Sequence, residues 1–198
     1  MSALGLRADK ESIDQLLEFV LQLRKWNRSY NLVSSTDVND VIRRHVLDSL
    51  SIHAYLLPGR MLDVGTGAGF PGLPLAIAIP ALDCTLLDST GKKIRFLRHI
   101  KRTLGLSNIH LKESRVADFQ DEIVFDTIVS RAFSSVVDFG SAVRHLAGSE
   151  TRLLAMKGKD PKGELKALPK WLKLLSVEKI SVPDLHAERH LVIMSVSG

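Results

Sequence analysis

The stretch of sequence that most constrains the fold reads Leu62-Asp63-Val64-Gly65-Thr66-Gly67-Ala68-Gly69-Phe70-Pro71-Gly72. A short apolar run precedes it, and a segment of helical character follows. Because glycine has no Cβ, the backbone of such a loop can approach a ligand closely. A helix that starts there presents free N–H groups. The stretch therefore predicts a strand, a ligand-binding loop and a helix in succession, and a tight turn without a ligand is the alternative.

Two cofactor patterns can be aligned with this loop. The dinucleotide fingerprint G-x-G-x-x-G fits Gly67, Gly69 and Gly72, which is a weak signal on its own. The pattern acidic-x-G-x-G-x-G begins at Asp63 and places Gly65 directly after the strand, as in a nucleotide-binding turn. S-adenosylmethionine has no phosphate for a helix dipole, and its ammonium calls for a carboxylate such as that of Asp63. We therefore favour S-adenosylmethionine, and an NAD-linked oxidoreductase is the alternative.

A second acidic residue follows the next apolar run. Residues 84–87 are apolar or small and lead into Asp88 and Ser89. A carboxylate at the end of this strand can accept hydrogen bonds from both ribose hydroxyls of a bound nucleoside. Asp88 therefore supports an adenosine-containing ligand, without choosing between the two cofactors.

The region from residue 60 onward alternates short apolar runs with helical patterns, such as the one over 92–104. Strands buried on both faces appear as continuous apolar runs, and their alternation with helices indicates a parallel sheet. The tail differs, because residues 172–182 and 189–196 can pair as an antiparallel hairpin around Pro183-Asp184. This layout is typical of the α/β fold of class I S-adenosylmethionine-dependent methyltransferases, Rossmann-like with a mostly parallel seven-stranded sheet and helices on both faces. The expected strands cover residues 61–64, 84–88, 109–111, 125–129 and 153–156.

The N-terminal third has helical periodicity instead. Apolar residues at helical spacing predict one helix over 10–30 and another over 37–57, which Pro58-Gly59 stops. The polar segment 27–36 joins them. We expect residues 1–59 to form a helical extension packed on a Rossmann-like methyltransferase core of residues 60–198.

Composition limits the partners and the location. The chain has 198 residues, of which 45% are hydrophobic and 25% charged, as in a globular domain with a full core. Its one cysteine and seven scattered histidines form no metal-ligand pattern, so we expect no metal. The longest apolar stretch, residues 73–82, is about half of a membrane span. The first residues lack a signal-peptide core. We expect a cytoplasmic protein without a membrane partner.

The net charge of +5 permits nucleic acid as a partner. Basic residues gather in three places, and for any one of them a solvated helix face is the better interpretation. These clusters are Arg24 to Arg28, Arg43-Arg44-His45, and Lys92 to Arg102.

The chain resembles the RsmG/GidB family of bacterial 16S rRNA guanine-N7 methyltransferases over nearly its whole length. Many class I enzymes share the glycine-rich loop, and other blocks are more specific. These include Lys25-Trp26-Asn27 with Tyr30-Asn31-Leu32, Arg44-His45 with Asp48-Ser49, Ser114-Arg115-Val116, Ser130-Arg131-Ala132, Lys157-Gly158, and Glu188-Arg189-His190-Leu191-Val192.

The resemblance implies methyl transfer to N7 of one guanine in 16S rRNA, near the decoding centre. By the same resemblance we expect S-adenosylmethionine as the cofactor, S-adenosylhomocysteine as the product, and 16S rRNA or the small ribosomal subunit as the partner. The resemblance also implies cofactor contacts at Gly65, Phe70, Val116, Ala117 and Arg131. Family members often carry an acid at the position of Ala117 and a glycine just upstream of Glu188, so this chain departs from the pattern there.

The chemistry agrees with this resemblance. Guanine N7 has a lone pair and no proton, so catalysis needs orientation rather than a general base. Residues 130–133 read Ser-Arg-Ala-Phe, unlike the Asn/Asp-Pro-Pro-aromatic block of amine methylation, and Cys84 is predicted to be a buried hydrophobe. Candidates for positioning the substrate are Arg131, Lys157, Arg189 and His190.

RNA binding should rest on phosphate contacts and on stacking of a splayed base. We expect the former at Arg44, His45, Lys157, Arg189 and His190. Trp26 and Phe133 are possible stacking platforms, although Trp26 is more often a core residue in such a helix. His45, Asp48 and Ser49 share a helical face, which is either a site or a hydrogen-bonded buttress. Arg131 faces the cofactor or the RNA, or forms an ion pair with Asp126 or Asp63.

Three alternatives to the rRNA enzyme stay open. They are a methyltransferase acting on another RNA or a small molecule, an NAD-linked oxidoreductase, and a non-catalytic RNA-binding protein that keeps a vestigial pocket. The intact acids and glycines at 63, 65, 67, 69 and 88 argue against the last of these. No dimer seam is evident, so we expect a monomer.

Overall fold

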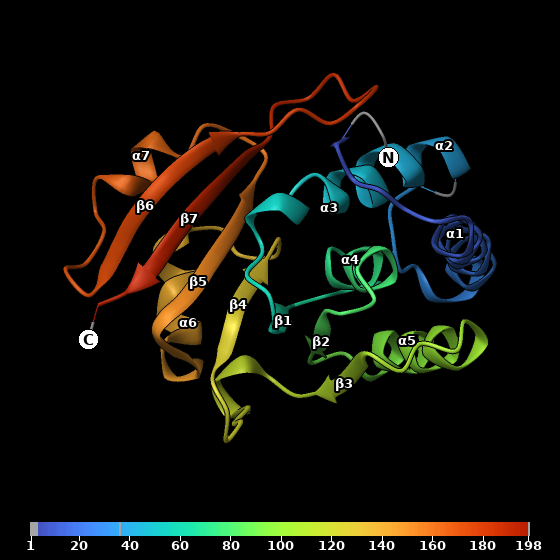
Figure 1. Ribbon diagram of the computed structural model, residues 1–198, viewed down its shortest axis with the longest axis horizontal. Helices are drawn as coiled ribbons and strands as arrows, with labels where there is room; N and C mark the ends of the chain where they lie inside the picture. The colour runs from blue at the N-terminus through green and yellow to red at the C-terminus, as the bar shows by residue number, and fades with distance from the viewer. Residues whose placement is uncertain (1–3, 36, 198) are drawn as a thin grey trace.

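Seven strands form one sheet in the order β3-β2-β1-β4-β5-β7-β6 (Figure 1). The computed structural model describes residues 4–35 and 37–197. Strands β1 to β5 pair in parallel, whereas β7 pairs antiparallel with both β5 and β6. The mostly parallel sheet and its antiparallel closing hairpin, both expected from the sequence, are confirmed. The strands are β1 (Arg60–Val64), β2 (Asp83–Asp88), β3 (Ile109–Glu113), β4 (Phe125–Ser130), β5 (Ala147–Lys157), β6 (Leu172–Lys179) and β7 (His190–Val196).

The hairpin is shorter than predicted. Strand β6 ends at Lys179, and the expected continuation to Val182 belongs to the connection, where Leu185 N–H donates to the Val182 carbonyl (3.2 Å). Pro183 has no N–H for a ladder, and Asp184 adopts a left-handed conformation (φ 56°), so the chain leaves the sheet before these residues.

Helices cover both faces of the sheet. Consecutive residues of a strand point to opposite faces, and Met61 and Leu62 of β1 accordingly belong to two different apolar clusters. The cluster of Met61 contains buried residues of α1, α4 and α5, and the cluster of Leu62 contains those of α6. The helices of the core are α4 (Gly72–Ala78), α5 (Gly91–Thr103), α6 (Val136–Val143) and α7 (Lys162–Leu165), with 3-10 turns at Val116–Asp118 and Arg144–Leu146.

The first helix, α1 (Lys10–Tyr30), is confirmed at both ends. Asp9 caps it by accepting from Ser12 N–H (2.8 Å), and Asn31 ends it in a left-handed conformation. The polar segment predicted over 27–36 begins inside this helix. Buried Asn27 holds the chain as it turns, because its side chain exchanges two hydrogen bonds with the backbone of Val33 (2.9 and 2.8 Å). Thr36 lies outside the described residues.

The second helix, predicted over 37–57, is present but ends at Leu50 and contains a π-helical turn. The segment consists of α2 (Val38–Val41), a π-helical turn (Ile42–Leu47), α3 (Asp48–Leu50) and a 3-10 turn (His53–Tyr55). A π turn has a wider repeat than an α-helix, so the buried residues Val41 and Val46 are five positions apart. The predicted helix is therefore confirmed over residues 38–50, and its predicted continuation to residue 57 is wrong.

The N-terminal helices pack on the sheet region through aromatic side chains. The Phe19 ring of α1 lies 5.3 Å from the Phe70 ring of the glycine-rich loop and 6.3 Å from the Phe96 ring of α5. All three side chains are buried in one apolar cluster. The boundary between an extension of residues 1–59 and a core of residues 60–198 stays a prediction; residues 1–3 and 198 lie outside the described part.

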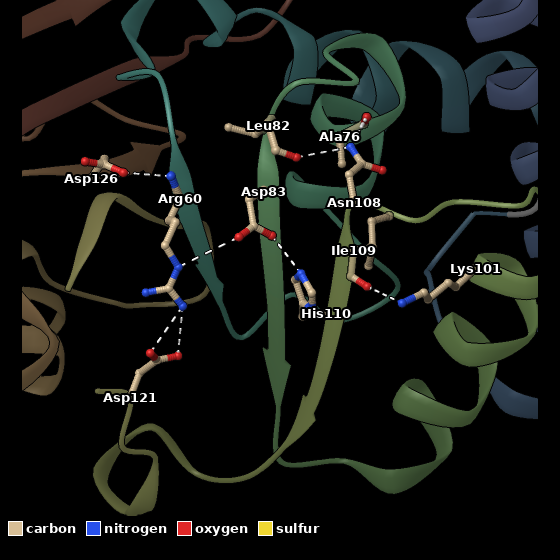
Figure 2. Close-up of polar contacts among 10 residues, drawn as sticks. All are labelled: Arg60, Ala76, Leu82, Asp83, Lys101, Asn108, Ile109, His110, Asp121 and Asp126. Atoms are coloured by element: carbon tan, nitrogen blue, oxygen red, sulfur yellow. Dashed lines mark hydrogen bonds and ion pairs between the residues drawn. The ribbon is translucent and has the colours of Figure 1, made fainter. Parts of the chain in front are cut away.

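The amino ends of β1, β2 and β3 carry an ion-pair network (Figure 2). Asp83 lies between Arg60 (Nε to Oδ2, 3.8 Å) and His110 (Nε2 to Oδ1, 2.7 Å). Arg60 also reaches Asp121 (3.1 Å), and its backbone N–H donates to Asp126 (2.7 Å). The side chains of Asp83 and His110 are about half exposed, at 46% and 52%.

Candidate active site

Asp63 stabilises the glycine-rich loop through hydrogen bonds to both of its halves. This side chain is fully buried at the end of β1, and its Oδ2 accepts from Thr66 Oγ1 (2.7 Å) and from Gly72 N–H (2.8 Å). Burial raises the pKa of Asp63 to about 6, against the lowering effect of these hydrogen bonds. The other oxygen, Oδ1, has no hydrogen-bond partner among the described residues. Asp63 therefore fixes the shape of the loop, and its predicted service to a cofactor ammonium stays a prediction.

The geometry of the loop requires glycine for two different reasons, which Gly67 and Gly72 illustrate. Gly67 has φ 62°, where a side chain would be strained, and its N–H donates to Asp88 Oδ2 (2.9 Å). At Gly72 a Cβ would lie 2.3 Å from Leu86 Cδ2 and 2.8 Å from Asp63 Oδ2. The loop therefore needs glycine at Gly67 for its conformation, as at Gly65 and Gly69, whose φ angles are also positive (71° and 103°), and at Gly72 for the close approach of α4 to the sheet.

Asp88 lies at the carboxyl end of β2, where its carboxylate collects donors. Its Oδ1 accepts from Thr90 N–H (2.8 Å), and its Oδ2 accepts from Gly67 N–H and faces Lys93 Nζ (3.2 Å). The side chain is 5% exposed and borders a cavity of about 440 Å³. Asp88 is thus an acceptor at the position from which sequence reasoning expected a ribose to be held.

This first cavity lies at the carboxyl ends of the parallel strands, the usual ligand position in open α/β sheets. Of the predicted cofactor residues, Gly65, Asp88, Ser89 and Val116 line it, whereas Asp63, Gly67, Gly69, Phe70, Ala117 and Arg131 do not. The rest of the cavity wall consists mainly of residues that the sequence did not indicate. The strand-end rule that found Asp88 would also have found Ser114 and Arg115 after β3. The missed residues are Val64, Leu87, Thr90, Lys93, Ser114, Arg115 and Ala132.

A second cavity of about 430 Å³ gathers most of the predicted RNA-binding residues. Arg44, His45, Lys157 and Arg189 line it, as does Arg131, a predicted cofactor residue. His190 does not, and its Nδ1 is buried without a hydrogen-bond partner in the described chain. Sequence reasoning missed the small or apolar lining residues Ser34, Ser35, Met156 and Gly158.

The buried carboxylate of Asp48 organises this second cavity. Its Oδ1 accepts from Arg189 Nε (2.8 Å), and its Oδ2 lies 3.4 Å from Arg131 Nη1. The Asp48 side chain is only 2% exposed. Three distant segments, namely α3, the end of β4 and the start of β7, meet at this one residue. The alternative that Arg131 pairs with Asp126 or Asp63 is wrong, since Arg131 is paired with Asp48.

His45 is a neutral hydrogen-bond acceptor in this cluster. Burial, followed by the charges of Arg131, Arg44 and Arg189, lowers the pKa of His45 to about 4. Its Nδ1 lies 3.2 Å from Arg131 Nη2, which can only donate, so Nδ1 accepts. His45 and Asp48 line the cavity, whereas fully buried Ser49 donates to the His45 carbonyl. The helical face shared by His45, Asp48 and Ser49 therefore contributes both to a cavity and to a supporting hydrogen bond.

Phe70 connects the loop with the N-terminal helices. The His45 ring stacks on it at 4.9 Å between centroids, and the Arg131 guanidinium lies 5.4 Å from its centre. Because Phe70 is buried and lines neither cavity, it supports the residues between them.

Three other candidates are explained by their contacts. Lys157 Nζ donates to the Ser134 carbonyl (2.6 Å) and pairs with Glu164 (2.9 Å), so its charge is already engaged. Trp26 packs against the rings of Tyr30, Phe96 and His99, in agreement with a core position, and lines neither cavity. Phe133 does line the first cavity.

Cys84 is buried in β2, and burial raises the pKa of its thiol well above the ordinary value. Within residues 4–35 and 37–197, no group of three or more His, Cys, Asp or Glu side chains is placed to hold a metal ion. In the same residues no helix is long and apolar enough to cross a membrane.

Solved structures share this fold. The crystal structure of TrmN from Thermus thermophilus matches with a TM-score of 0.59 and 18% identity, over 76% of this chain and 48% of that longer chain. P. horikoshii TYW2 in complex with MeSAdo matches with a TM-score of 0.60 and 14% identity, over 77% and 62%. At such identities the matches concern the fold alone, and the class I methyltransferase fold is confirmed.

Sequence relatives are much closer. A protein named ribosomal RNA small subunit methyltransferase G from Pseudomonas aeruginosa is 48% identical over 96% of this chain and 90% of its own length. One of the same name from Escherichia coli is 44% identical over 98% and 93%. The family model GidB, described as rRNA small subunit methyltransferase G, matches residues 12–192. This chain therefore belongs to the GidB family of methyltransferases.

Proposed function

We propose that this protein transfers a methyl group from S-adenosylmethionine to N7 of one guanine in 16S rRNA. The observation that carries the proposal is the adjacency of two cavities at the end of β4. Arg131 lines the basic cavity, and its neighbour Ala132 lines the cavity that contains Asp88. A cofactor in one and an acceptor base in the other would meet beside these two residues. The names of the relatives, which specify small-subunit ribosomal RNA, support the choice of acceptor.

The first cavity fits the cofactor. Asp88 offers a carboxylate at the position that accepts ribose hydroxyls, and a Cβ at Gly65 would approach Ala132 Cβ to 2.8 Å, so the cavity floor admits only glycine there. Val116 and Leu87 add apolar contact for an adenine, and Ser89 a hydroxyl. When bound, the sulfonium of S-adenosylmethionine supplies an electrophilic methyl group and leaves as S-adenosylhomocysteine.

The second cavity fits an RNA nucleotide better than a small apolar substrate. Arginine forks suit phosphate and the edges of bases. Arg44, Arg131 and Arg189 supply three of them, and their charges exceed the single negative charge of Asp48. A neutral His45 adds a planar ring that does not repel the cation formed when N7 is methylated. Because N7 carries no proton, these residues only orient the base and exclude water.

Residues 1–59 act as a helical extension that completes the acceptor cavity of a core formed by residues 60–198. Arg44, His45 and Asp48 come from this extension, whereas Arg131 and Arg189 come from the core. The catalytic unit is a monomer without a metal, it works in the cytoplasm, and its partner is 16S rRNA or the small ribosomal subunit.

The proposal is tested with S-adenosylmethionine labelled in its methyl group and small ribosomal subunits from cells that lack this protein. Wild-type protein should label the RNA. Arg189→Gln should bind S-adenosylhomocysteine normally and lose most of the transfer, because Arg189 belongs to the acceptor cavity alone. Lys170→Gln, at an exposed position away from both cavities, is the matched control. Wild-type transfer to rRNA by Arg189→Gln would remove Arg189 from the acceptor site, and no labelling of rRNA by the wild type would refute the function.

A further inference from the structure

Helix α5 carries an unusual concentration of positive charge. Its sequence GKKIRFLRHIKRT has six lysines and arginines and no acidic residue. Two of these cations have partners within the protein. Lys93 pairs with Asp88. Lys101 Nζ donates to the Ile109 carbonyl, as Figure 2 shows. The side chains of the other four are exposed and make no ion pair or hydrogen bond with the part of the chain that the structure describes. We call Lys92, Arg95, Arg98 and Arg102 the α5 basic face.

These four positions share one side of the helix. At about 100° per residue they fall within an arc of about 120°. The opposite side is apolar and almost completely buried in the core, through Ile94, Phe96, Leu97 and Ile100. A membrane-surface helix needs a free apolar face to insert. The apolar face of α5 is already used, so the charge is available only to a polyanion in solution.

The α5 basic face starts beside the first cavity. Thr90, just before the helix, and Lys93 in its first turn both line that cavity. The thirteen residues of α5 extend about 20 Å from there. Two acids lie at this end of α5: Asp88, which pairs with Lys93, and Glu113, whose carboxylate oxygen would lie 2.7 Å from a Cβ at Gly91. A strand held along α5 would therefore run from the active site toward the far end of the helix.

A second basic cluster lies on the helix packed against α5. Arg24, Lys25 and Arg28 are exposed on the last part of α1. Trp26 between them packs on Phe96 and His99 of α5, at 5.6 and 5.1 Å between ring centres. At about 100° per residue, Arg24, Lys25 and Arg28 lie on the side of α1 turned away from Trp26 and therefore away from α5, so this cluster is separate from the α5 basic face.

We propose that the α5 basic face binds the phosphate backbone of the RNA strand that carries the methylated base. The inference rests on the proposed function for the identity of the polyanion. The four side chains are long, unpaired within the described residues and solvated, and none of the exposed positions of α5 is aromatic. Such a surface holds phosphates and gives register, and it leaves selection of the base to the cavities.

The test compares a triple variant, Arg95→Gln with Arg98→Gln and Arg102→Gln, with the wild type. The matched control is Lys166→Gln with Lys170→Gln and Lys173→Gln, which removes the same charge from exposed positions in the segment from α7 to β6. In Figure 1 these two elements lie on the other side of the molecule from α5. Binding of 16S rRNA from cells that lack this protein is measured at several salt concentrations, together with S-adenosylhomocysteine affinity and Tm.

Each phosphate contact on a single strand contributes about 0.7 to the slope of log affinity against log salt. Loss of three contacts should reduce the slope by about two. The advantage of the wild type over the triple variant should then shrink about 20-fold between 50 and 200 mM salt. We expect an increased KM for RNA, an unchanged kcat, and unchanged cofactor affinity and Tm. The control variant should keep the wild-type slope.

An unchanged slope in the triple variant, or an equal change in the control variant, would overturn the inference. Neither result would affect the proposed function if the wild type methylates rRNA. If the wild type methylates no rRNA, the proposed function fails first, and the slope measurement still reports whether α5 binds RNA.

Discussion

The parallel strands begin at one side of the sheet, here called the amino edge, and end at the other, the carboxyl edge. Charged residues of the same types have different roles at these two edges. At the amino edge, Asp83 and Asp121 pair with Arg60 and His110 at partly exposed positions (Figure 2). At the carboxyl edge, the carboxylates of Asp63, Asp88 and Asp48 are 0%, 5% and 2% exposed. There they accept from backbone N–H groups of the loop or from arginines that line a cavity.

The ion pairs at the amino edge therefore connect neighbouring strands, whereas the buried carboxylates at the carboxyl edge fix the geometry of the candidate site. Exposed ion pairs contribute little to stability, usually below about 1 kcal/mol, because water screens them. Burying a carboxylate costs desolvation free energy, which its hydrogen bonds and ion pairs offset only in part. Three carboxylates are buried at the carboxyl edge. Asp63 and Asp88 hold the glycine-rich loop in shape, and Asp48 positions the arginines of the acceptor cavity.

The largest difference should come from replacing, one at a time, the aspartates at the two ends of β2. Asp88→Ala should weaken S-adenosylhomocysteine binding by about 100-fold, since it removes a ribose acceptor and releases Gly67 N–H. Asp83→Ala, at the other end of the same strand, should leave that affinity unchanged. Calorimetric titration measures both. Equal losses in the two variants would contradict the division between the edges.

Asp48→Asn should give the next largest effect. It keeps the shape of the side chain but removes the charge that pairs with Arg131 and Arg189, at a cost of about 2 kcal/mol in unfolding free energy. We expect a KM for RNA increased by at least about tenfold, with unchanged cofactor affinity. Asp40→Asn, which breaks the exposed pair with Arg44, is the matched control. A loss of stability with unchanged kinetics would leave Asp48 a purely structural role.

The pH dependence of stability should reveal two opposing groups at the carboxyl edge. The folded pKa of Asp63 is raised from 3.8 to about 6, so its contribution is present below pH 4 and is lost as the pH rises through 6. The folded pKa of His45 is lowered from 6.5 to about 4, so its contribution is present above pH 6.5 and is lost as the pH falls.

Single variants should therefore tilt the curve in opposite directions between pH 4 and 6. Asp63→Asn keeps the acceptor for Thr66 and Gly72 and should make stability rise more steeply with pH, by on the order of 2 kcal/mol over the interval. His45→Gln removes a contribution that grows with pH, so the unfolding free energy of this variant should rise less steeply with pH than that of the wild type. Urea unfolding at several pH values measures both, and curves parallel to the wild type would show that neither group titrates as described.

The smallest effect should come from the amino edge. His110→Gln removes the imidazole that lies 2.7 Å from an Asp83 carboxylate that is about half exposed. The unfolding free energy should fall by less than about 1 kcal/mol, and cofactor affinity and methyl transfer should not change. Denaturant unfolding with a parallel activity assay checks this. A clear loss of activity would mean that the two edges are coupled.

Sequence reasoning went furthest where chemistry depends on neighbours in the chain. The positions of Asp63, Gly65 and Asp88 follow from the rule that strands end in ligand loops, and the sheet followed from the apolar runs. The π turn at 42–47 was missed because hydrophobic spacing alone does not distinguish its repeat from that of an α-helix. The partners of Asp48 were missed because they come from residues 83 and 141 positions away, which no local pattern relates.

The most direct measurement of the central claim is the position of the methyl group. Small-subunit RNA from cells lacking this protein is incubated with the protein and S-adenosylmethionine, then treated with borohydride and aniline, which cleave the strand at 7-methylguanine. We expect one new cleavage, at a single guanine of 16S rRNA, that is absent when the Asp88→Ala variant is used. Methylation without such a cleavage, or cleavage at many guanines, would contradict this claim.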